Sequence, residues 1–213
     1  MCAIVGFESE NVTEKDLVIL KKVLIESKIR GKHASGVAWF NGVKICCEKK
    51  PVPMDRFLKD FDLSKIVYNG KVKMIAHARY STSDLEFNQP LVSENLAIAH
   101  NGVVTQEAPE NWEKLFGFKC ETRNDSELLL RALENNVDVV EKFPASSIAM
   151  VILSCSGVLC FRNGKRPLWK GEVGEGKIFA STFDILKRAG VNNIFPVKSV
   201  GEDLQKRGKL WTI

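Results

Sequence analysis

Two short apolar segments separated by Asn41-Gly42 constrain the fold of this chain more than any other local feature. Asn-Gly is the strongest short-range signal for a tight hairpin, because both residues tolerate the positive φ angles that such a turn requires. Gly36–Phe40 and Val43–Cys47 flank this pair, and we expect them to form antiparallel strands. The fold therefore needs an antiparallel sheet with at least one buried face.

Other apolar segments extend this pattern. We expect a strand at Ala3–Phe7, directly after Cys2, and then a helix with Thr13 and Asp16 as a capping box and Gly31 as its stop. Further strands are expected at residues 72–78, 96–100, 148–153, 158–162, 178–181 and 209–213, and helices at 54–61 and 125–134. Strands in hairpins, with helices in separate groups, favour an α+β fold.

Composition excludes several classes of protein. The net charge is +5, but the lysine clusters are short and carry no interleaved aromatic residues, so we expect solvated faces and no nucleic-acid site. The six cysteines are scattered and the three histidines lie far apart, so neither a disulfide framework nor a metal site is expected. No apolar segment is long enough for a membrane span and no signal peptide is recognisable. We expect one domain, residues 1–213, in the cytoplasm, without a cofactor.

Cys2 carries the first chemical hypothesis. Removal of Met1 before a small residue would leave Cys2 with a free α-amino group. A thiol has an ordinary pKa of about 8.5 and an α-amino group one of about 7.7–8.0, so a neutral amine can take the thiol proton near neutral pH. Taken alone, however, Cys2 is more simply explained as the small apolar start of a strand.

Five short motifs occur in a fixed order along the chain. They are Met1-Cys2-Ala3-Ile4-Val5-Gly6, Arg30-Gly31-Lys32-His33-Ala34-Ser35-Gly36, His77-Ala78-Arg79-Tyr80-Ser81-Thr82, His100-Asn101-Gly102 and Asn124-Asp125-Ser126-Glu127. They are similar to the patterns M-C-G-I-x-G, R-G-x-D-x-x-G, H-x-R-W/Y-A/S-T, the H-N-G turn and S/T-D-S/T-E. In this order, these are the patterns of the class II glutamine amidotransferases, which the chain resembles over nearly its whole length. Arg166-Pro167-Leu168 and Ala180-Ser181 are similar to two later elements of that family.

The resemblance implies a fold and a reaction. The family fold is the N-terminal nucleophile hydrolase sandwich, in which two antiparallel sheets lie between helical layers in the order αββα. The implied reaction is attack by the Cys2 thiol on the side-chain amide of L-glutamine, release of ammonia, and hydrolysis of a γ-glutamyl thioester to glutamate. Family members often carry a synthase domain after this one. No such domain is recognised among the motifs of this sequence. We therefore expect either that a separate synthase uses the ammonia as a partner protein, or that this chain acts as a simple glutaminase.

The resemblance also assigns roles around the nucleophile. The side chain of Asn101 and the backbone N–H of Gly102 would form the oxyanion hole, which must hold negative charge on the amide oxygen. Arg79 would bind the substrate carboxylate with its planar fork, and Asp125 would bind the ammonium. Thr82 is a further expected contact to the substrate.

Three more residues are expected to support the site without binding the substrate, namely Arg30, His77 and His100. A histidine base for Cys2 is disfavoured, because the resemblance gives that role to the terminal amine.

Three departures from the family pattern stand near these motifs, and two other functions stay open. Ala3 replaces a glycine, His33 an acidic residue and Gln106 an asparagine. An amidase of the same fold that acts on another amide would keep Cys2 and Asn101 without needing the two charge partners for glutamine. A non-catalytic binding module would keep its function after loss of Cys2.

Overall fold

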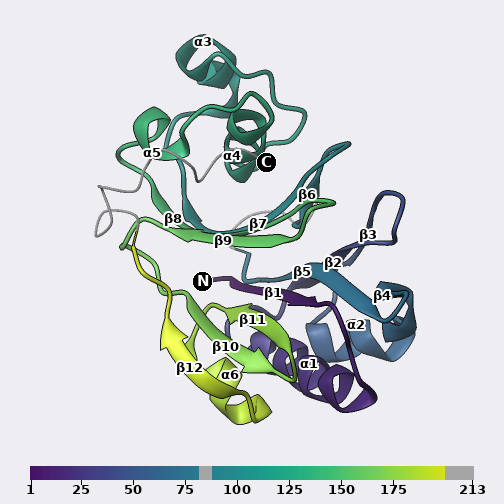
Figure 1. Ribbon diagram of the computed structural model, residues 1–213. Coiled ribbons are helices and arrows are strands. Elements are labelled where there is room, and N and C mark those ends of the chain that lie inside the picture. The colour runs from purple at the N-terminus through teal and green to yellow at the C-terminus, as the bar shows by residue number, and fades with distance from the viewer. Residues whose placement is uncertain (82–87, 200–213) are drawn as a thin grey trace.

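The computed structural model describes residues 1–81 and 88–199, and its helices and strands form four layers (Figure 1). The larger sheet has eight strands. Seven of them run in the order β12 (Asn192–Pro196), β10 (Trp169–Val173), β11 (Gly176–Ala180), β1 (Ala3–Ser9), β5 (Lys71–Arg79), β2 (Ala34–Phe40) and β3 (Ile45–Lys50). The eighth, β4 (Val67–Tyr68), pairs with β5. The smaller sheet has the order β6 (Leu91–Val92), β7 (Ala97–Val103), β8 (Ser147–Leu153) and β9 (Val158–Arg162). Every pairing described is antiparallel.

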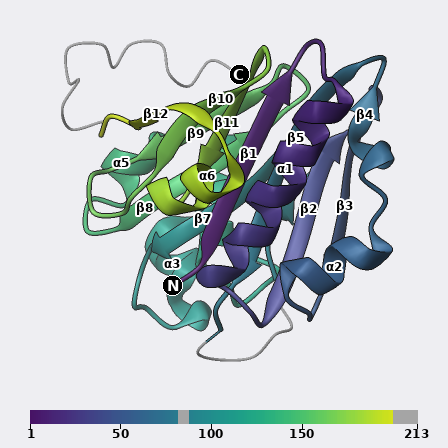
Figure 2. The ribbon, with the colours of Figure 1, turned by 90° about the horizontal axis from the view of Figure 1, so that it is seen from below.

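Helices cover the outer face of each sheet. The larger sheet carries α1 (Glu14–Glu26), α2 (Met54–Asp60) and α6 (Phe183–Ala189), and Figure 2 shows α1 running alongside β1. The smaller sheet carries α3 (Trp112–Phe116), α4 (Ser126–Glu134) and α5 (Val139–Lys142). The expected αββα sandwich is therefore confirmed. Within the described residues, none of the helices combines the length and the apolar character that a membrane span requires.

Alternation along the strands builds three hydrophobic layers. In β1, Val5 and Phe7 pack against α1 and α6, whereas Ile4 lies between the two sheets. In β8, Met150 packs against the helices of the smaller sheet and Val151 against the larger sheet. Because successive side chains of a strand point to opposite faces, each inner strand supplies two layers at once.

Gly6 sets how closely the two sheets approach. A Cβ at this position would lie 3.1 Å from Val158 Cγ1 and 3.2 Å from Val151 Cγ1, both of which belong to the opposite sheet. The contact would be tighter than ordinary van der Waals packing, so the close approach at this point depends on the missing side chain.

Most expected elements are present, but the first helix ends earlier than expected. Thr13 and Asp16 form the capping box of α1, but the helix ends at Glu26 and a 3-10 turn, Ser27–Ile29, follows it, so Gly31 does not stop the helix. A Cβ at Gly31 would lie 2.1 Å from the carbonyl oxygen of Ala78, which explains the glycine by close backbone approach. The strand expected at residues 209–213 lies outside the described residues.

The Asn41-Gly42 hairpin forms, but with a longer connection than a two-residue turn. Phe40 pairs with Ile45, and the Asn41 side chain accepts hydrogen bonds from the backbone N–H groups of Val43 and Lys44. This Asx-type turn keeps residue 43 out of the second strand.

Candidate active site

One end of the inter-sheet space gathers the residues that the motifs single out. Strand β1 begins where β5 ends, since Ala3 pairs with Ala78. Every second side chain of a strand lies on the same face. Ile4 in β1 and Ile75 in β5 lie between the two sheets, so Cys2 is on the same face as Ile4, and His77 and Arg79 are on the same face as Ile75. In β7, Ala97 and Ala99 likewise lead to Asn101.

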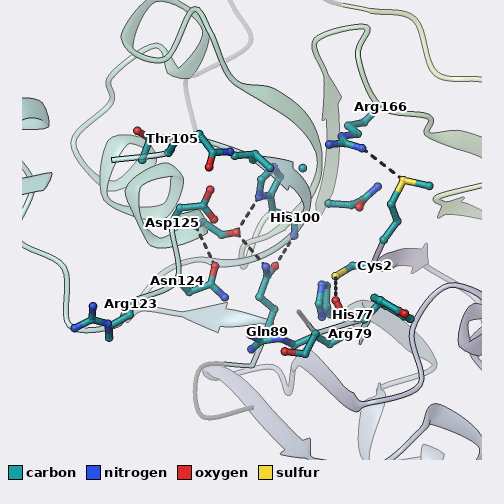
Figure 3. A pocket seen from close by; sticks show the side chains of 18 of the residues that line it. Cys2, His77, Arg79, Gln89, His100, Thr105, Arg123, Asn124, Asp125 and Arg166 are labelled. Carbon is teal, nitrogen blue, oxygen red and sulfur yellow. Dashed lines mark hydrogen bonds between the residues drawn. The ribbon is translucent and has the colours of Figure 1, made fainter. Parts of the chain in front are cut away.

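A cavity of about 480 Å³ opens at this end, and its walls come from several elements (Figure 3). They include the chain start, the ends of β5 and β7, the loop after β7 and the start of α4. The predicted site residues that line it are Cys2, His77, Arg79, His100, Asn101, Gly102 and Asp125. Arg30 lies beside it, where its Nε donates a 2.9 Å hydrogen bond to the Cys2 carbonyl. Thr82 lies outside the described residues.

Cys2 is held at the mouth of the cavity by its neighbours on both sides. Its thiol contacts the carbonyl oxygen of Tyr80 at 3.9 Å (Figure 3), and the next strand residues pair with β5. On the other side, the backbone N–H of Ile4 donates to Ser181 Oγ at 2.9 Å, and Ser181 N–H donates to the Ile4 carbonyl. The sulfur is thus placed by a central strand of the larger sheet.

Asn101 has a buried donor that no described residue satisfies. The residue is 4% exposed, and its Nδ2 makes no hydrogen bond to any described residue. An unsatisfied buried donor costs about 1–3 kcal/mol, so its presence in a cavity calls for an explanation by ligand binding. Gly102 follows in the same strand, where a Cβ would lie 1.7 Å from the Ser147 carbonyl oxygen. The expected H-N-G turn is wrong, because these residues continue β7 and pair with β8.

His100 is part of a satisfied polar network on the helix side of β7. Its Nε2 lies 3.3 Å from the Ser147 carbonyl oxygen and its Nδ1 2.8 Å from Ser126 Oγ, while Gln89 Nε2 donates to the same hydroxyl at 3.0 Å. The Ser126 hydroxyl therefore donates to Nδ1, and Nε2 carries the ring proton. Burial lowers the pKa of His100, which keeps the imidazole neutral.

His77 is fully buried and neutral. Burial, together with the positive charge of Arg79 and the neighbouring His100, lowers the pKa of His77 to about 3. Neither ring nitrogen has a hydrogen-bond partner among the described residues. Such an imidazole is a poor proton acceptor for a thiol at neutral pH, which supports the terminal amine over a histidine as base.

Two oppositely charged residues lie on different walls of the cavity. Arg79 ends β5 and donates from Nη1 to Asn88 Oδ1 at 3.1 Å. Asp125 caps α4, and its Oδ2 accepts a 2.7 Å hydrogen bond from the Val104 backbone N–H. That bond fixes the Asp125 carboxylate at the cavity wall, so Arg79 and Asp125 give the site a positive and a negative group on facing elements, among other charged residues of the lining.

The three departures from the family pattern occupy different places. Ala3 is buried in β1, and Gln106 lines the cavity. His33 Nδ1 accepts a 2.9 Å hydrogen bond from the Ser81 backbone N–H, and its ring packs against Tyr80 with centroids 4.9 Å apart. His33 thus contacts both Tyr80 and Ser81, the two residues after Arg79.

Arg166 is a lining residue to which the sequence interpretation gave no role at the site. Its Nη1 lies 3.5 Å from the Met1 sulfur (Figure 3), and its Nε donates to Ser147 Oγ at 3.2 Å. The Arg166-Pro167-Leu168 element was the available signal. Gln89, which joins the His100 network, had no signal of its own.

Comparison with known proteins finds a similar curated sequence. No family model matches the chain. The glutamine–fructose-6-phosphate aminotransferase (isomerizing) of Helicobacter pylori strain J99 is 26% identical over 202 residues, which cover 87% of this chain and 33% of that protein. The chain thus spans about a third of the length of this curated relative.

Solved structures share the fold. The glutamine phosphoribosylpyrophosphate amidotransferase of B. subtilis superposes with a TM-score of 0.68 at 22% identity, covering 93% of this chain and 46% of that one. A class II glutamine aminotransferase domain protein of Silicibacter pomeroyi gives 0.54 at 10% identity, with 93% and 92% covered. The architecture is therefore the N-terminal nucleophile fold found in class II glutamine amidotransferases.

Proposed function

We propose that this chain, with the fold of the class II glutamine amidotransferases, hydrolyses the side-chain amide of L-glutamine. The Cys2 thiol gives its proton to the α-amino group and attacks the amide carbon. The carbon–nitrogen bond then breaks, and the amine returns the proton to the departing ammonia. Water hydrolyses the resulting γ-glutamyl thioester to glutamate and restores the thiol.

The Nδ2 of Asn101, which has no hydrogen-bond partner within residues 1–81 and 88–199, carries the proposal, because it is a buried donor in the cavity that Cys2 also lines. Attack on an amide places negative charge on its oxygen, and a donor fixed beforehand stabilises that charge without reorganisation. The backbone N–H of Gly102 is assigned to the same oxygen.

The charges on the cavity walls support glutamine over other amides. Arg79 is assigned to the α-carboxylate and Asp125 to the α-ammonium. Both charged groups on the α-carbon of an amino acid would then be bound while its side chain reaches Cys2. The volume of about 480 Å³ falls within the roughly 300–1,000 Å³ that is typical of small-molecule sites. An amidase for uncharged substrates gains nothing from this pair.

The test measures glutamate and ammonia released from L-glutamine by the purified chain. We expect turnover only in protein whose intact mass shows that Met1 has been removed, because a retained methionine turns the amine into a peptide N–H. A Cys2→Ala variant should be inactive, and Cys155→Ala, which removes an exposed thiol, should keep full activity. Full turnover by protein that retains Met1 would contradict the terminal-amine mechanism.

A separate protein is proposed to consume the ammonia. The matched segment makes up 33% of the Helicobacter pylori aminotransferase and 46% of the B. subtilis amidotransferase, whose names include fructose-6-phosphate and phosphoribosylpyrophosphate. A cytoplasmic location belongs to the same proposal and rests on the sequence. Glutamine labelled with nitrogen-15 at the amide, added to the native cell extract, would identify the acceptor by the metabolite that gains the label.

A further inference from the structure

The side chain of Gln89 takes the place of a strand partner for β7. Strand β6 pairs with β7 only at Ala97 and Ile98 among the described residues. Gln89 lies two residues before β6 and His100 two residues after Ile98, so the same register brings them opposite each other. There Gln89 Oε1 accepts a 2.6 Å hydrogen bond from the His100 backbone N–H. A side chain therefore holds this edge of β7 at His100.

Gly102 presents its backbone N–H on the same edge of β7. Along an antiparallel strand, the N–H groups of alternate residues point to the same side. The His100 N–H points away from β8, toward Gln89, so the Gly102 N–H does the same. Ile148, the register partner of Gly102 in β8, uses both its N–H and its carbonyl oxygen for hydrogen bonds with Asn163. The Gly102 N–H thus lies on the edge away from β8, in a residue that lines the cavity.

The other end of the Gln89 amide reaches α4. Its Nε2 donates a 3.0 Å hydrogen bond to Ser126 Oγ, which lies 2.8 Å from His100 Nδ1 (Figure 3). All three residues are buried. Asn101 directly follows His100, and Asp125 directly precedes Ser126. One buried amide therefore connects the strand of the proposed oxyanion donors to the start of the helix that carries the proposed ammonium partner.

We infer that Gln89 is a positioning residue of the oxyanion hole, which acts through His100 to fix the direction of the Asn101 side chain and the Gly102 N–H. The inference rests on the proposed function. Donors that are fixed before the reaction stabilise a developing charge without reorganisation, whereas an unpaired strand edge would let Asn101 and Gly102 shift. A displacement of about 1 Å at an active site lowers a rate by about 100-fold.

The first experiment separates positioning from substrate binding. Gln89→Met keeps the approximate size and length of the side chain but removes both hydrogen bonds. It should lower kcat for glutamine about 10- to 100-fold and change KM by less than about threefold, because the oxyanion exists only after attack. Asn11→Ala is the control, since it removes an exposed amide that bonds Glu175 beyond the far end of β1, and it should leave both constants unchanged. A raised KM with unchanged kcat would make Gln89 a substrate contact and overturn the inference.

The second experiment asks whether the nucleophile itself is intact in Gln89→Met. When iodoacetamide alkylates Cys2, a sulfur–carbon bond forms and iodide leaves, so no charge develops on an amide oxygen. The rate of this reaction, followed by the mass of the N-terminal peptide, should therefore equal that of the unsubstituted chain. Alkylation that slows as much as kcat would place the defect in the nucleophile or the fold, and the inference would be wrong.

The third experiment needs no turnover and begins with the unsubstituted chain. Amide hydrogen exchange, measured by NMR without ligand, should be slow at His100 and faster at Gly102. Gln89→Met should speed exchange at His100 about tenfold or more, while Asn101, whose N–H points toward β8, keeps its rate. Slow exchange at Gly102, or an unchanged rate at His100, would overturn the inference. A chain that releases no ammonia from glutamine would refute the proposed function, whereas these exchange rates test the arrangement around Gln89 separately.

Discussion

At the scale of single residues, Asn101 offers the sharpest test of the oxyanion hole. We expect Asn101→Ala to lower kcat about 100- to 1,000-fold with a much smaller change in KM, because the negative oxygen exists only after attack. Steady-state kinetics with glutamine measure both constants. A variant with the kcat of the unsubstituted chain would return Asn101 to a structural role.

The two charge partners should act on substrate binding. Arg79→Ala and Asp125→Ala should each raise KM for glutamine by tenfold or more, since each leaves one substrate charge unpaired in the cavity. Arg123→Ala serves as the control, because Arg123 lines the same cavity but is exposed and paired with Glu110. Unchanged KM in the first two variants would contradict the assignment to glutamine.

The sequence led to most residues of this cavity through the motifs, and its alternation explains why they meet. Cys2, Arg79 and Asn101 each continue the inter-sheet face of a strand. The Asn-Gly pair at 101 was misassigned to a turn, because local turn propensity is overridden by pairing with β8. Arg166 could not be placed, since its contact with Met1 depends on how a loop far along the chain returns to the N-terminus.

At the scale of elements, Glu127 organises the loop that precedes α4. Its carboxylate accepts hydrogen bonds from the backbone N–H groups of Glu121 and Thr122 and pairs with Arg131 at 2.8 Å, while the side chain is 3% exposed. Glu127→Gln should destabilise the protein by about 1–3 kcal/mol, as expected when a buried acceptor is replaced. Glu134→Gln, which removes a more exposed partner of Arg131, should cost less than about 1 kcal/mol in the same urea titration.

The same carboxylate predicts a pH dependence. Burial opposes its ionisation, but the hydrogen bonds from Glu121, Thr122 and Arg131 outweigh burial and lower the pKa of Glu127 below 4.5. When the pKa of a carboxyl group is lower in the folded state than in the unfolded state, its ionised form stabilises the fold. This contribution is complete above the pKa of the unfolded state and is lost as the pH falls through the pKa of the folded state. The difference in unfolding free energy between the unsubstituted chain and Glu127→Gln should therefore shrink below pH 4.5. A difference that stays constant from pH 6 to pH 3 would contradict this account.

Elements with a strong local signal were predictable, and those without one were not. The capping box of α1 and the continuous apolar run of β8 are local features. Strand β12 is mostly exposed, so no apolar period marks it. Strand β10 contains Gly171, where a Cβ would lie 2.5 Å from Val191 Cγ1, so this glycine reflects a tertiary contact that the local pattern does not show.

At the scale of the whole molecule, the contact between Gly6 and Val158 tests how the sheets pack. Gly6→Ala should destabilise the protein by about 1–3 kcal/mol, because the added methyl meets Val158 and Val151 across the interface. Val158→Ala, which removes the nearest methyl group, should relieve part of that cost in the double variant. Denaturant titrations of the four proteins measure the coupling, and strict additivity would show that the sheets do not meet as described.

The four-layer order itself was predictable only through the family resemblance. Alternation assigns residues to faces but does not decide which strands are neighbours. Here β1 lies between β5 and β11, and its pairing of Val5 with Ala180 joins opposite ends of the described chain. The single-domain expectation for residues 1–213 stays a prediction.

The central place of β1 also imposes an order in time on protein synthesis. Residues 71–79 can pair with β1 early, but β11 and Ser181, which complete its other side, are made about a hundred residues later. At roughly 5–20 residues per second, this delay is on the order of ten seconds. During that interval only one side of β1 can be paired, and the proposed removal of Met1, which stays 64% exposed in the folded chain, does not have to wait for the second side.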